Sequence, residues 1–333
     1  MKESTENTKS FIEQIKLLLR NAQFETARSV NHIMVKTYFE LGKRIVENEQ
    51  EGCKTAEYGE YILQNLSKEL TEEFGKGYSK RNLELVRKFY LTYSFAKSAI
   101  SQSLTWTHYL HLMRIQNEAE RNFYEIETVS NNWSVREMSR QINSSLYERL
   151  QLGKGISEIR DLSNNGQLIE KPFDIIKDPY VLEFLNIPNH SAFNETEFES
   201  ALIDNLEHFM LELGKGFTFA GRQVRFTFDE EHYRIDLVFY NRILKSFVLI
   251  DLKIGKLKHQ DIGQMQMYVN YYDRFIKTTD ENDTIGIILC KDKKDSMVEI
   301  TLPKNNKQIF ASKYQLYLPT ENQLLNELKK VEM

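Results

Sequence analysis

Apolar and polar positions follow a helical period over residues 1–152. Across residues 8–50 the apolar side chains recur every three or four positions, which places them on one face of an α-helix. Proline is absent before Pro172, so long helices in this half of the chain are unobstructed. Further on, Ser134 and Glu137 have the spacing of a capping box and mark the start of another helix. We therefore expect an all-α N-terminal domain.

A helix, a short glycine-containing turn and a basic helix follow one another within this domain. The first helix is predicted over about Ala56–Phe74 and ends at the stop signal Gly75-Lys76-Gly77, after which Ser79 begins the second. This order outlines a helix-turn-helix, whose second helix would contact DNA. The simpler alternative is a pair of packed helices with a solvated basic face. The candidate nucleic-acid-binding side chains of the second helix are Lys80, Arg81, Arg87 and Lys88.

From residue 195 onward the pattern changes to mixed helices and strands. Period-two alternation and enrichment in β-branched and aromatic residues predict strands, whereas longer periodic stretches predict helices. The order α-β-β-β-α-β indicates a mixed sheet with helices on its faces. The predicted elements are a helix over Glu195–Leu213, strands near Phe217–Gln223 and Val224–Phe228, a two-stranded hairpin over His232–Gly255, a helix over Leu257–Ile276, strands over Thr284–Cys290 and Tyr314–Leu318, and a short C-terminal helix.

Residues 153–194 differ from both flanks and are expected to form a linker. Glycine, asparagine and three of the chain's five prolines punctuate this segment. Residues 161–200 also carry eight acidic but only two basic side chains. The predicted organisation is therefore an α+β two-domain protein, with a helical domain over 1–152, a linker over 153–194 and a mixed-sheet domain over 195–333.

Composition narrows the functional classes without selecting one. The net charge of −4 over 333 residues gives no bulk attraction to nucleic acid, so any such surface has to be local. No apolar stretch approaches the ~18 residues of a membrane span, and the first residues lack an apolar signal core. The two cysteines, Cys53 and Cys290, have neither the spacing of metal ligands nor that of a disulfide framework. These features predict a cytoplasmic protein that does not bind membranes.

Three charged residues interrupt the predicted hairpin. Asp236 lies inside its first apolar strand, and Asp251 and Lys253 lie at the end of the second. Residues two apart share one face of a strand, so Asp251 and Lys253 point the same way. Burying such groups is costly unless they form pairs or bind a cation. Two carboxylates suit magnesium, and a nearby lysine can orient or deprotonate a water and offset the negative charge that develops at a phosphate.

An acid from the preceding helix would complete such a site, with Glu199 and Glu207 as the candidates. The alternative is a structural ion pair, in which Lys253 neutralises Asp251 or Asp236. Three ionisable groups converge where the strands would otherwise hold valine or isoleucine, and this convergence favours a functional site.

The spacing of these residues resembles the PD-(D/E)XK nuclease superfamily. Asp236 is followed fifteen residues later by Asp251-Leu252-Lys253, and Gln264 lies on the next predicted helix. The likeness is closer still to the bacterial YhcG-type nucleases, and it covers nearly the whole chain. The phrases that carry it include LTWTHYLHLMRI, FYEIE, LYERL, ELGKGF, GRQ, IDLVFYN, IDLKIG and IGIILCKDK, in this order.

The resemblance implies a restriction-endonuclease-like fold in the C-terminal domain and a divalent-metal site that acts on nucleic acid. Asp236 and Asp251 stand at the two acidic positions of the motif and would bind Mg²⁺ or Mn²⁺, and Lys253 stands at the motif lysine. Glu199 matches the acid of the first core helix, and Gln264 matches a glutamine on the helix after the lysine. The resemblance therefore implies five catalytic residues.

Two departures from the motif concern its acidic positions. Ile235 stands where the motif has proline, and Asp251 stands where many relatives carry glutamate. Both are tolerated variants, so the catalytic set is complete. The leading hypothesis is a magnesium-dependent DNA endonuclease whose helical domain binds DNA or mediates assembly, with Arg222 as a further candidate contact to nucleic acid. RNA stays open as a substrate.

Two other classes of function remain as alternatives. The nuclease-like domain would bind nucleic acid without cutting it, or the chain would act as a protein assembly factor. The complete set of two acids and a lysine favours the enzyme. The tyrosine- and phenylalanine-rich helical domain is also compatible with a homo-oligomer, in which two active sites would address two strands.

Overall fold

Two compact units make up the chain in the computed structural model, the first over Met1–Met138 and the second over Ser139–Met333. The structure describes residues 2–51, 56–94, 101, 103–152, 154–187 and 193–318. Cys53 and the predicted C-terminal helix lie outside these residues. Residues 139–152, which the sequence assigns to the helical domain, belong to the second unit.

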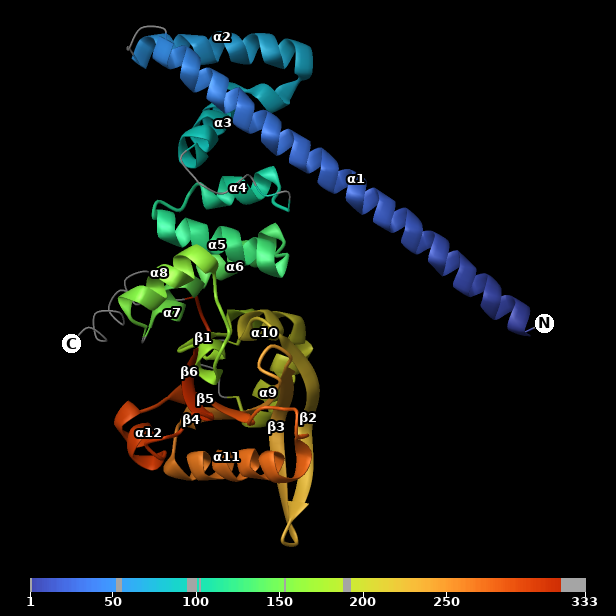
Figure 1. The fold of residues 1–333 in the computed structure, drawn as a ribbon, viewed down its shortest axis with the longest axis vertical. Helices are drawn as coiled ribbons and strands as arrows, with labels where there is room; N and C mark the ends of the chain where they lie inside the picture. The colour runs from blue at the N-terminus through green and yellow to red at the C-terminus, as the bar shows by residue number, and fades with distance from the viewer. Residues whose placement is uncertain are drawn as a thin grey trace. The chain divides into compact units, whose positions relative to one another are not determined.

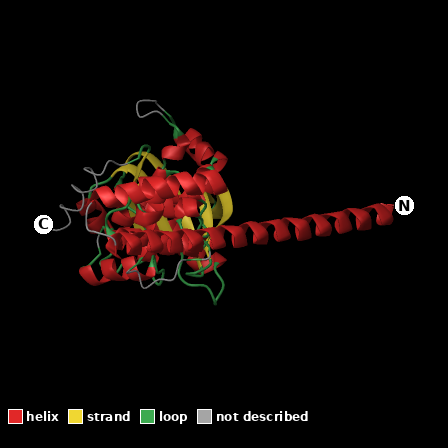
Figure 2. Cartoon of the chain, turned by 90° about the horizontal axis from the view of Figure 1, so that it is seen from above, coloured by secondary structure: helices red, strands yellow, loops and turns green. Residues whose placement is uncertain are grey.

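The described part of the first unit is entirely helical, as the hydrophobic period predicts. Its longest element is α1 (Lys2–Glu51), which runs as one unbroken helix (Figure 2). The second half of α1 contains buried side chains, such as Val35 and Ile45, where it packs against α3 (Lys80–Tyr93). No described helix is both long and apolar enough to cross a membrane. The other helices are α2 (Ala56–Phe74), α4 (Trp106–Leu112), α5 (Glu118–Asn131) and α6 (Val135–Asn143), which contains the boundary between the units.

The helix, turn and helix predicted in this unit are present as α2, a short turn and α3. Gly75 ends α2 with a positive φ of 88°, which glycine adopts without steric cost. The turn continues as a short 3₁₀-helix, η1 (Lys76–Tyr78). Leu63 of α2, Leu83 of α3 and Ile45 of α1 form one apolar cluster. The sequence therefore predicts the local order of these elements correctly.

A six-stranded mixed sheet lies at the centre of the described part of the second unit, with the strand order β1-β6-β5-β4-β3-β2 (Figure 1). β2, β3 and β4 are antiparallel neighbours, whereas β4, β5, β6 and β1 pair in parallel. This arrangement confirms the predicted α+β fold class. The strands are β1 (Tyr180–Val181), β2 (Phe217–Phe228), β3 (Glu231–Asn241), β4 (Ser246–Lys256), β5 (Ile285–Asp292) and β6 (Ile309–Gln315).

Besides this sheet, the described part of the second unit contains helices and short helical turns. The helices are α7 (Leu146–Gln151), α8 (Ile156–Asn165), α9 (Glu195–Asp204), α10 (Leu206–Leu213), α11 (His259–Tyr271) and α12 (Asp295–Thr301), together with the 3₁₀-helices η2 (Pro172–Ile175) and η3 (Glu183–Leu185) and the π-helical turn η4 (Tyr272–Ile276).

Alternation along the strands sends their side chains into two cores, one on each face of the sheet. Ile250 and Leu252 of β4 pack with residues of α9 and α10, whereas Leu249 packs with residues of α11. Gly286 of β5 lies under α11, where an added Cβ atom would come within 2.7 Å of the Met265 side chain. The close approach of α11 to β5 therefore requires glycine at this position.

The segment expected as a linker, 153–194, contributes elements to the second unit. Tyr180 and Val181 form β1, which pairs in parallel with Tyr314 and Gln315 of β6. The helix α8 and the turns η2 and η3 lie in the same segment. Its proline- and glycine-rich composition therefore belongs to short elements joined by tight turns.

Four further elements differ from the prediction. The helix expected over Glu195–Leu213 is two helices, α9 and α10, which meet at Asn205 because its φ of −114° and ψ of 32° leave the helical region. The two strands expected between residues 217 and 228 are one strand, β2, with an irregularity between Phe219 and Gly221. The last strand, β6, begins before the predicted Tyr314–Leu318, and α12 was not predicted because seven residues are too few for a clear period.

Glu212 of α10 is a fully buried carboxylate. Its Oε1 accepts hydrogen bonds from Arg149 of α7 at 2.5 Å and from the Val181 N–H of β1 at 3.0 Å. Its Oε2 accepts one from Arg140 of α6 at 3.2 Å, and Lys177 donates to its backbone carbonyl. Burial by itself would raise the pKa of Glu212, but Arg149, Lys177 and Arg140 lower it to about 2. This network ties α6, α7 and β1 to α10.

Replacing Glu212 with glutamine is expected to destabilise the second unit by about 3–5 kcal/mol, because Arg149 would stay fully buried without a counter-charge. Equilibrium unfolding in urea measures this change. Glu207 lies exposed on the same helix, so Glu207→Gln should alter the free energy of unfolding by less than about 0.5 kcal/mol. Equal effects of the two variants would contradict the role assigned to the network.

The same network predicts a sensitivity to acid. The folded-state pKa of Glu212, about 2, lies below the ordinary value of 4.5, so the ionised carboxylate stabilises the fold above pH 4.5. Its contribution, about 3 kcal/mol, is lost as the pH falls from the ordinary value toward the folded-state value. Free energies of unfolding measured across this range should fall more steeply for the unaltered chain than for Glu212→Gln. If the free energies of unfolding of the two proteins fell in parallel with pH, the prediction would be wrong.

Candidate active site

β3 and β4 pair with each other along only part of their length. Their ladder stops at the pair Leu237↔Ile250. Beyond this pair β3 stays with β2, whereas β4 continues beside β5. The residues that follow the last pair are Asp236 on β3 and Asp251 on β4, and we call this place the fork. The two acids therefore lie where two neighbouring strands part.

Asp236 bonds to both sides of the fork. Its Oδ2 accepts a hydrogen bond from the backbone N–H of Leu252 at 2.8 Å, which gives a partner to a β4 donor beyond the end of the ladder. Its Oδ1 accepts a hydrogen bond from the side-chain amide of Gln223 on β2 at 3.2 Å. The carboxylate of Asp236 thus holds β2, β3 and β4 in register at the point where they separate.

Glu199 reaches the fork from α9 and is only 3% exposed. The same Gln223 amide donates to Glu199, and Arg222 Nε lies 3.3 Å from Glu199 Oε1. Burial and the Asp236 carboxylate raise the pKa of Glu199, and Arg222 and Gln223 only partly offset this effect. The amide of Gln223 therefore joins two carboxylates that repel each other.

Asp251 and Lys253 form an ion pair on β4. Lys253 Nζ lies 2.8 Å from Asp251 Oδ2, as their shared strand face predicts, and Asp251 is only 3% exposed. Burial raises the pKa of Asp251, Lys253 opposes this shift, and Asp236 adds to it. Burial also disfavours the charge of Lys253, but the Asp251 carboxylate raises the pKa of Lys253 above its ordinary value. The ion pair considered from the sequence therefore exists, and it lies at the fork.

Gln223 is a site residue that sequence reasoning missed. Its φ of 49° lies in the left-handed region, although it is within a strand, and the β2–β3 ladder is interrupted where Gln223 lies between the pairs Arg222↔Leu237 and Val224↔Ile235. This local conformation directs its side chain toward both Glu199 and Asp236. The phrase GRQ contains Gln223 but carries no signal for such a backbone conformation.

Two other acidic or amide candidates lie away from these contacts. Glu207 is exposed on α10, so Glu199 is the helix acid that reaches the fork. Gln264 is exposed on α11, and no hydrogen bond joins it to the fork carboxylates in the described residues. The catalytic role of Gln264 stays a prediction.

The basic side chains of α3 vary in exposure. Arg81 and Lys88 are exposed, and Lys80 is half-buried. Arg87 forms an ion pair with Glu49 of α1, with its Nε 2.6 Å from Glu49 Oε2. Contact between these residues and nucleic acid stays a prediction.

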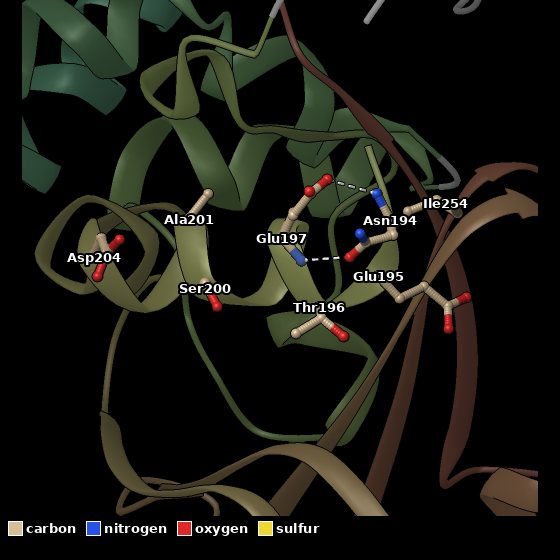
Figure 3. Close-up of a pocket in the computed structure, with 8 residues that line it drawn as sticks. All are labelled: Asn194, Glu195, Thr196, Glu197, Ser200, Ala201, Asp204 and Ile254. Carbon is tan, nitrogen blue, oxygen red and sulfur yellow. Dashed lines mark hydrogen bonds between the residues drawn. The ribbon is translucent and has the colours of Figure 1, made fainter. Parts of the chain in front are cut away.

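An open pocket of about 930 Å³ lies along α9 (Figure 3). Residues from the first to the last turn of α9 line it together with Ile254 of β4. A capping box fixes the start of α9, because the Asn194 N–H donates to Glu197 and the Glu197 N–H donates to Asn194 Oδ1 at 2.9 Å. Glu195, which also lines the pocket, contributes to the raised pKa of Lys253. The pocket therefore opens next to the charged groups of β4.

The fork provides a donor set that suits a divalent cation. Among the described residues no three histidine, cysteine, aspartate or glutamate side chains form a ready metal-ligand cluster. Asp236 and Asp251 nevertheless lie close enough that the first raises the pKa of the second. A divalent cation would relieve this repulsion, and magnesium binds through one or two carboxylates with water and phosphate oxygens as its other ligands. The residues present therefore fit magnesium.

Comparison with known proteins agrees with this arrangement. Residues 14–149 match the family described as the DUF1016 N-terminal domain, and residues 173–329 match the YhcG PDDEXK nuclease domain. YhcG of Escherichia coli (strain K12) is 36% identical over 346 residues, which cover 95% of this chain and 92% of that protein.

Solved structures give only distant matches. A repair endonuclease from Pyrococcus abyssi and the EndoMS–dsDNA2 complex are each 14% identical, with a TM-score of 0.26 and 40% of this chain covered. The matches span 50% and 51% of those chains. Likeness of this degree supports no inference about the present chain.

The family matches and the relative of similar length lead to one conclusion. Both halves of the chain are covered, and Asp236, Asp251 and Lys253 lie within the part that matches the nuclease domain. The chain therefore belongs to the YhcG family of proteins with a PDDEXK nuclease domain.

Proposed function

We propose that this protein is a divalent-metal-dependent DNA endonuclease whose active site is the fork between β3 and β4. The observation that carries the proposal is the placement of Asp236 and Asp251 at the end of the β3–β4 ladder, with Lys253 Nζ 2.8 Å from Asp251. Hydrolysis of a phosphodiester needs an oriented water and stabilisation of the negative charge that develops on the phosphate. The groups at the fork are of the kinds that supply both.

Asp236 and Asp251 are the residues that would hold Mg²⁺, or Mn²⁺ in its place. When bound, the cation supplies Lewis-acid stabilisation of charge on the phosphate oxygens. The support for this assignment is the donor set itself, since the Asp236 carboxylate adds to the raised pKa of Asp251 and the Lys253 ammonium only partly offsets it.

Lys253 and Glu199 have separate roles in this proposal. The ammonium of Lys253 donates hydrogen bonds to the attacking water or to a phosphate oxygen and orients it beside Asp251. Glu199 accepts a hydrogen bond from a water at the entrance of the fork, opposite the donors Gln223 and Arg222 that position its carboxylate. Gln223 is a positioning residue, because it acts through Glu199 and Asp236.

The helical first unit would contribute contacts to DNA or to a second copy of the chain. Arg81 and Lys88 of α3 are exposed and can reach backbone phosphates. Such contacts fix the position of a nucleic acid without reading its sequence. The substrate assay therefore includes linear, supercoiled and branched DNA together with RNA.

Asp251→Ala and Lys253→Ala are each expected to reduce cutting of DNA at least about 100-fold, because each removes a charged group at the fork. Incubation of the purified chain with these substrates, with and without magnesium, measures the effect. Glu299 is exposed on α12, so Glu299→Gln is the matched control and should cut at the unaltered rate. Cutting that persists in both fork variants would overturn the proposal, and DNA binding without any metal-dependent product would favour a binding protein.

Gln223→Ala is expected to slow cutting and also to lower the free energy of unfolding by about 1–3 kcal/mol, because two carboxylates lose the donor between them. Gln266 is exposed on α11, so Gln266→Ala provides the control for both measurements. Gln223→Asn keeps the amide on a side chain that is one methylene shorter. It should therefore lower the free energy of unfolding less than Gln223→Ala does. If Gln223→Ala leaves both quantities unchanged, the positioning role is wrong.

A further inference from the structure

Beyond the fork, β2 and β3 continue as a two-stranded ribbon that extends past the rest of the sheet (Figure 1). We call residues 224–235 the ribbon. Within the described chain its strands pair only with each other, because the β3–β4 ladder has already ended. Asp229 and Glu230, with φ of 52° and 66°, form the two-residue turn that closes it. The ribbon therefore begins at the proposed active site and leads away from it.

One face of the ribbon is apolar and packs against α11 and η4. Phe226 stacks on Tyr271 at the end of α11, with ring centroids 4.1 Å apart. Phe228 packs against Phe275 of η4 at 6.2 Å, and Tyr233 stacks on Phe226 at 5.3 Å. These contacts hold the ribbon against α11 and η4, so its opposite face turns away from them.

The opposite face is polar and exposed. Strand alternation places Arg225, Thr227, His232 and Arg234 on it, and all four side chains are exposed. No acidic side chain shares this face within residues 224–235 except at the turn. Glu231 alternates to the apolar face, where it accepts a hydrogen bond from the Tyr233 hydroxyl at 2.6 Å.

Two arginines lie directly opposite each other on this face. Arg225 and Arg234 are cross-strand partners in the β2–β3 ladder. Like charges at such a position destabilise a sheet unless a counter-charge lies between them. No ion pair of either arginine occurs among the described residues, and both side chains are exposed. The pair is therefore placed to bind an anion from outside the chain.

The anion has to be one that a row of hydrogen-bond donors can recognise. The arginines can both donate, Thr227 and His232 bond each other at 2.9 Å, and the oxygens of a backbone phosphate only accept. Arg234 also lies near enough to Glu199 to lower the pKa of that carboxylate, so the row starts at the fork. A two-stranded ribbon has the width to lie along a groove of double-stranded DNA.

We propose that this polar face binds the backbone phosphates of double-stranded DNA next to the bond that is cut, through Arg225 and Arg234. The inference rests on the proposed nuclease function, since it assigns the surface that carries the substrate to the fork. Phosphate contacts position a duplex independently of its sequence. They also make affinity depend on salt, because each neutralised phosphate releases condensed counterions.

The test measures binding of the full chain to a short DNA duplex by fluorescence anisotropy, in EDTA and over a series of salt concentrations. EDTA prevents metal-dependent cutting, so the result does not depend on catalysis. Arg225→Gln with Arg234→Gln is expected to weaken binding about tenfold at low salt and to reduce the slope of log K against log salt by about two. Replacing both arginines with lysine should preserve the slope, because lysine also neutralises phosphates.

Arg242 provides the matched control. It is an exposed arginine just beyond the opposite end of β3, and Arg242→Gln should leave affinity and slope unchanged. The double glutamine variant should unfold at the same temperature as the unaltered chain or at a higher one, since it removes a like-charged pair. The inference would be overturned if the double glutamine variant bound DNA with an unchanged slope of log K against log salt. It would also be overturned if Arg242→Gln lost as much DNA affinity as that variant.

A cutting assay separates this inference from the function on which it rests. If the unaltered chain cuts DNA and the double glutamine variant cuts it with a raised KM but a similar kcat, both hold. If the unaltered chain binds duplex DNA through this face but never cuts it, the proposed function fails and the binding surface stands. If it cuts DNA and the variant has the same KM, the inference fails and the function stands.

Discussion

The hydrogen bond from the Leu252 N–H to the Asp236 carboxylate determines how the centre of the second unit is built. β3 must stay with β2 to form the ribbon, whereas β4 must stay with β5 to complete the parallel part of the sheet. Strands that part inside a protein leave backbone groups without partners, and such groups are costly when buried. A side-chain carboxylate at the point of separation meets this requirement. The end of the β3–β4 ladder also brings a second acid, Asp251, close to Asp236. The separation of the two strands therefore also places the charged groups of the fork.

A second buried carboxylate, Glu212, performs a different task with similar chemistry. At the fork, burial raises the pKa of Asp251, the Asp236 carboxylate adds to this shift, and Lys253 only partly offsets it. Around Glu212, the cations Arg149, Lys177 and Arg140 more than offset the effect of burial, and its pKa falls. A carboxylate that is only partly compensated suits a site that binds something positive, whereas a fully compensated one suits a permanent link between helices and strands. The direction of the pKa shift therefore distinguishes the binding site from the structural network within one unit.

Much of this architecture can be predicted from the sequence, because long periodic stretches dominate it. The hydrophobic pattern locates α2, α3 and β5, and the misplaced charges in the hairpin locate Asp236, Asp251 and Lys253. The pattern fails where tertiary contacts decide the structure. β1 has two residues and exists only because β6 pairs with it, and Arg149 is fully buried in the second unit, where Glu212 neutralises it. Gln223 depends on a left-handed backbone conformation inside a strand, for which glutamine carries no signal.

The two-residue periodicity of the ribbon restricts how its length can change during evolution. Inserting or deleting one residue in each strand would exchange its faces, so that the arginines would meet the aromatic rings of α11 and the rings would meet solvent. Adding two residues to each strand would preserve both faces and move the turn farther from the fork. The length of this hairpin in related proteins should therefore differ by multiples of two residues in each strand. Each such step would add one more cross-strand pair to the exposed face.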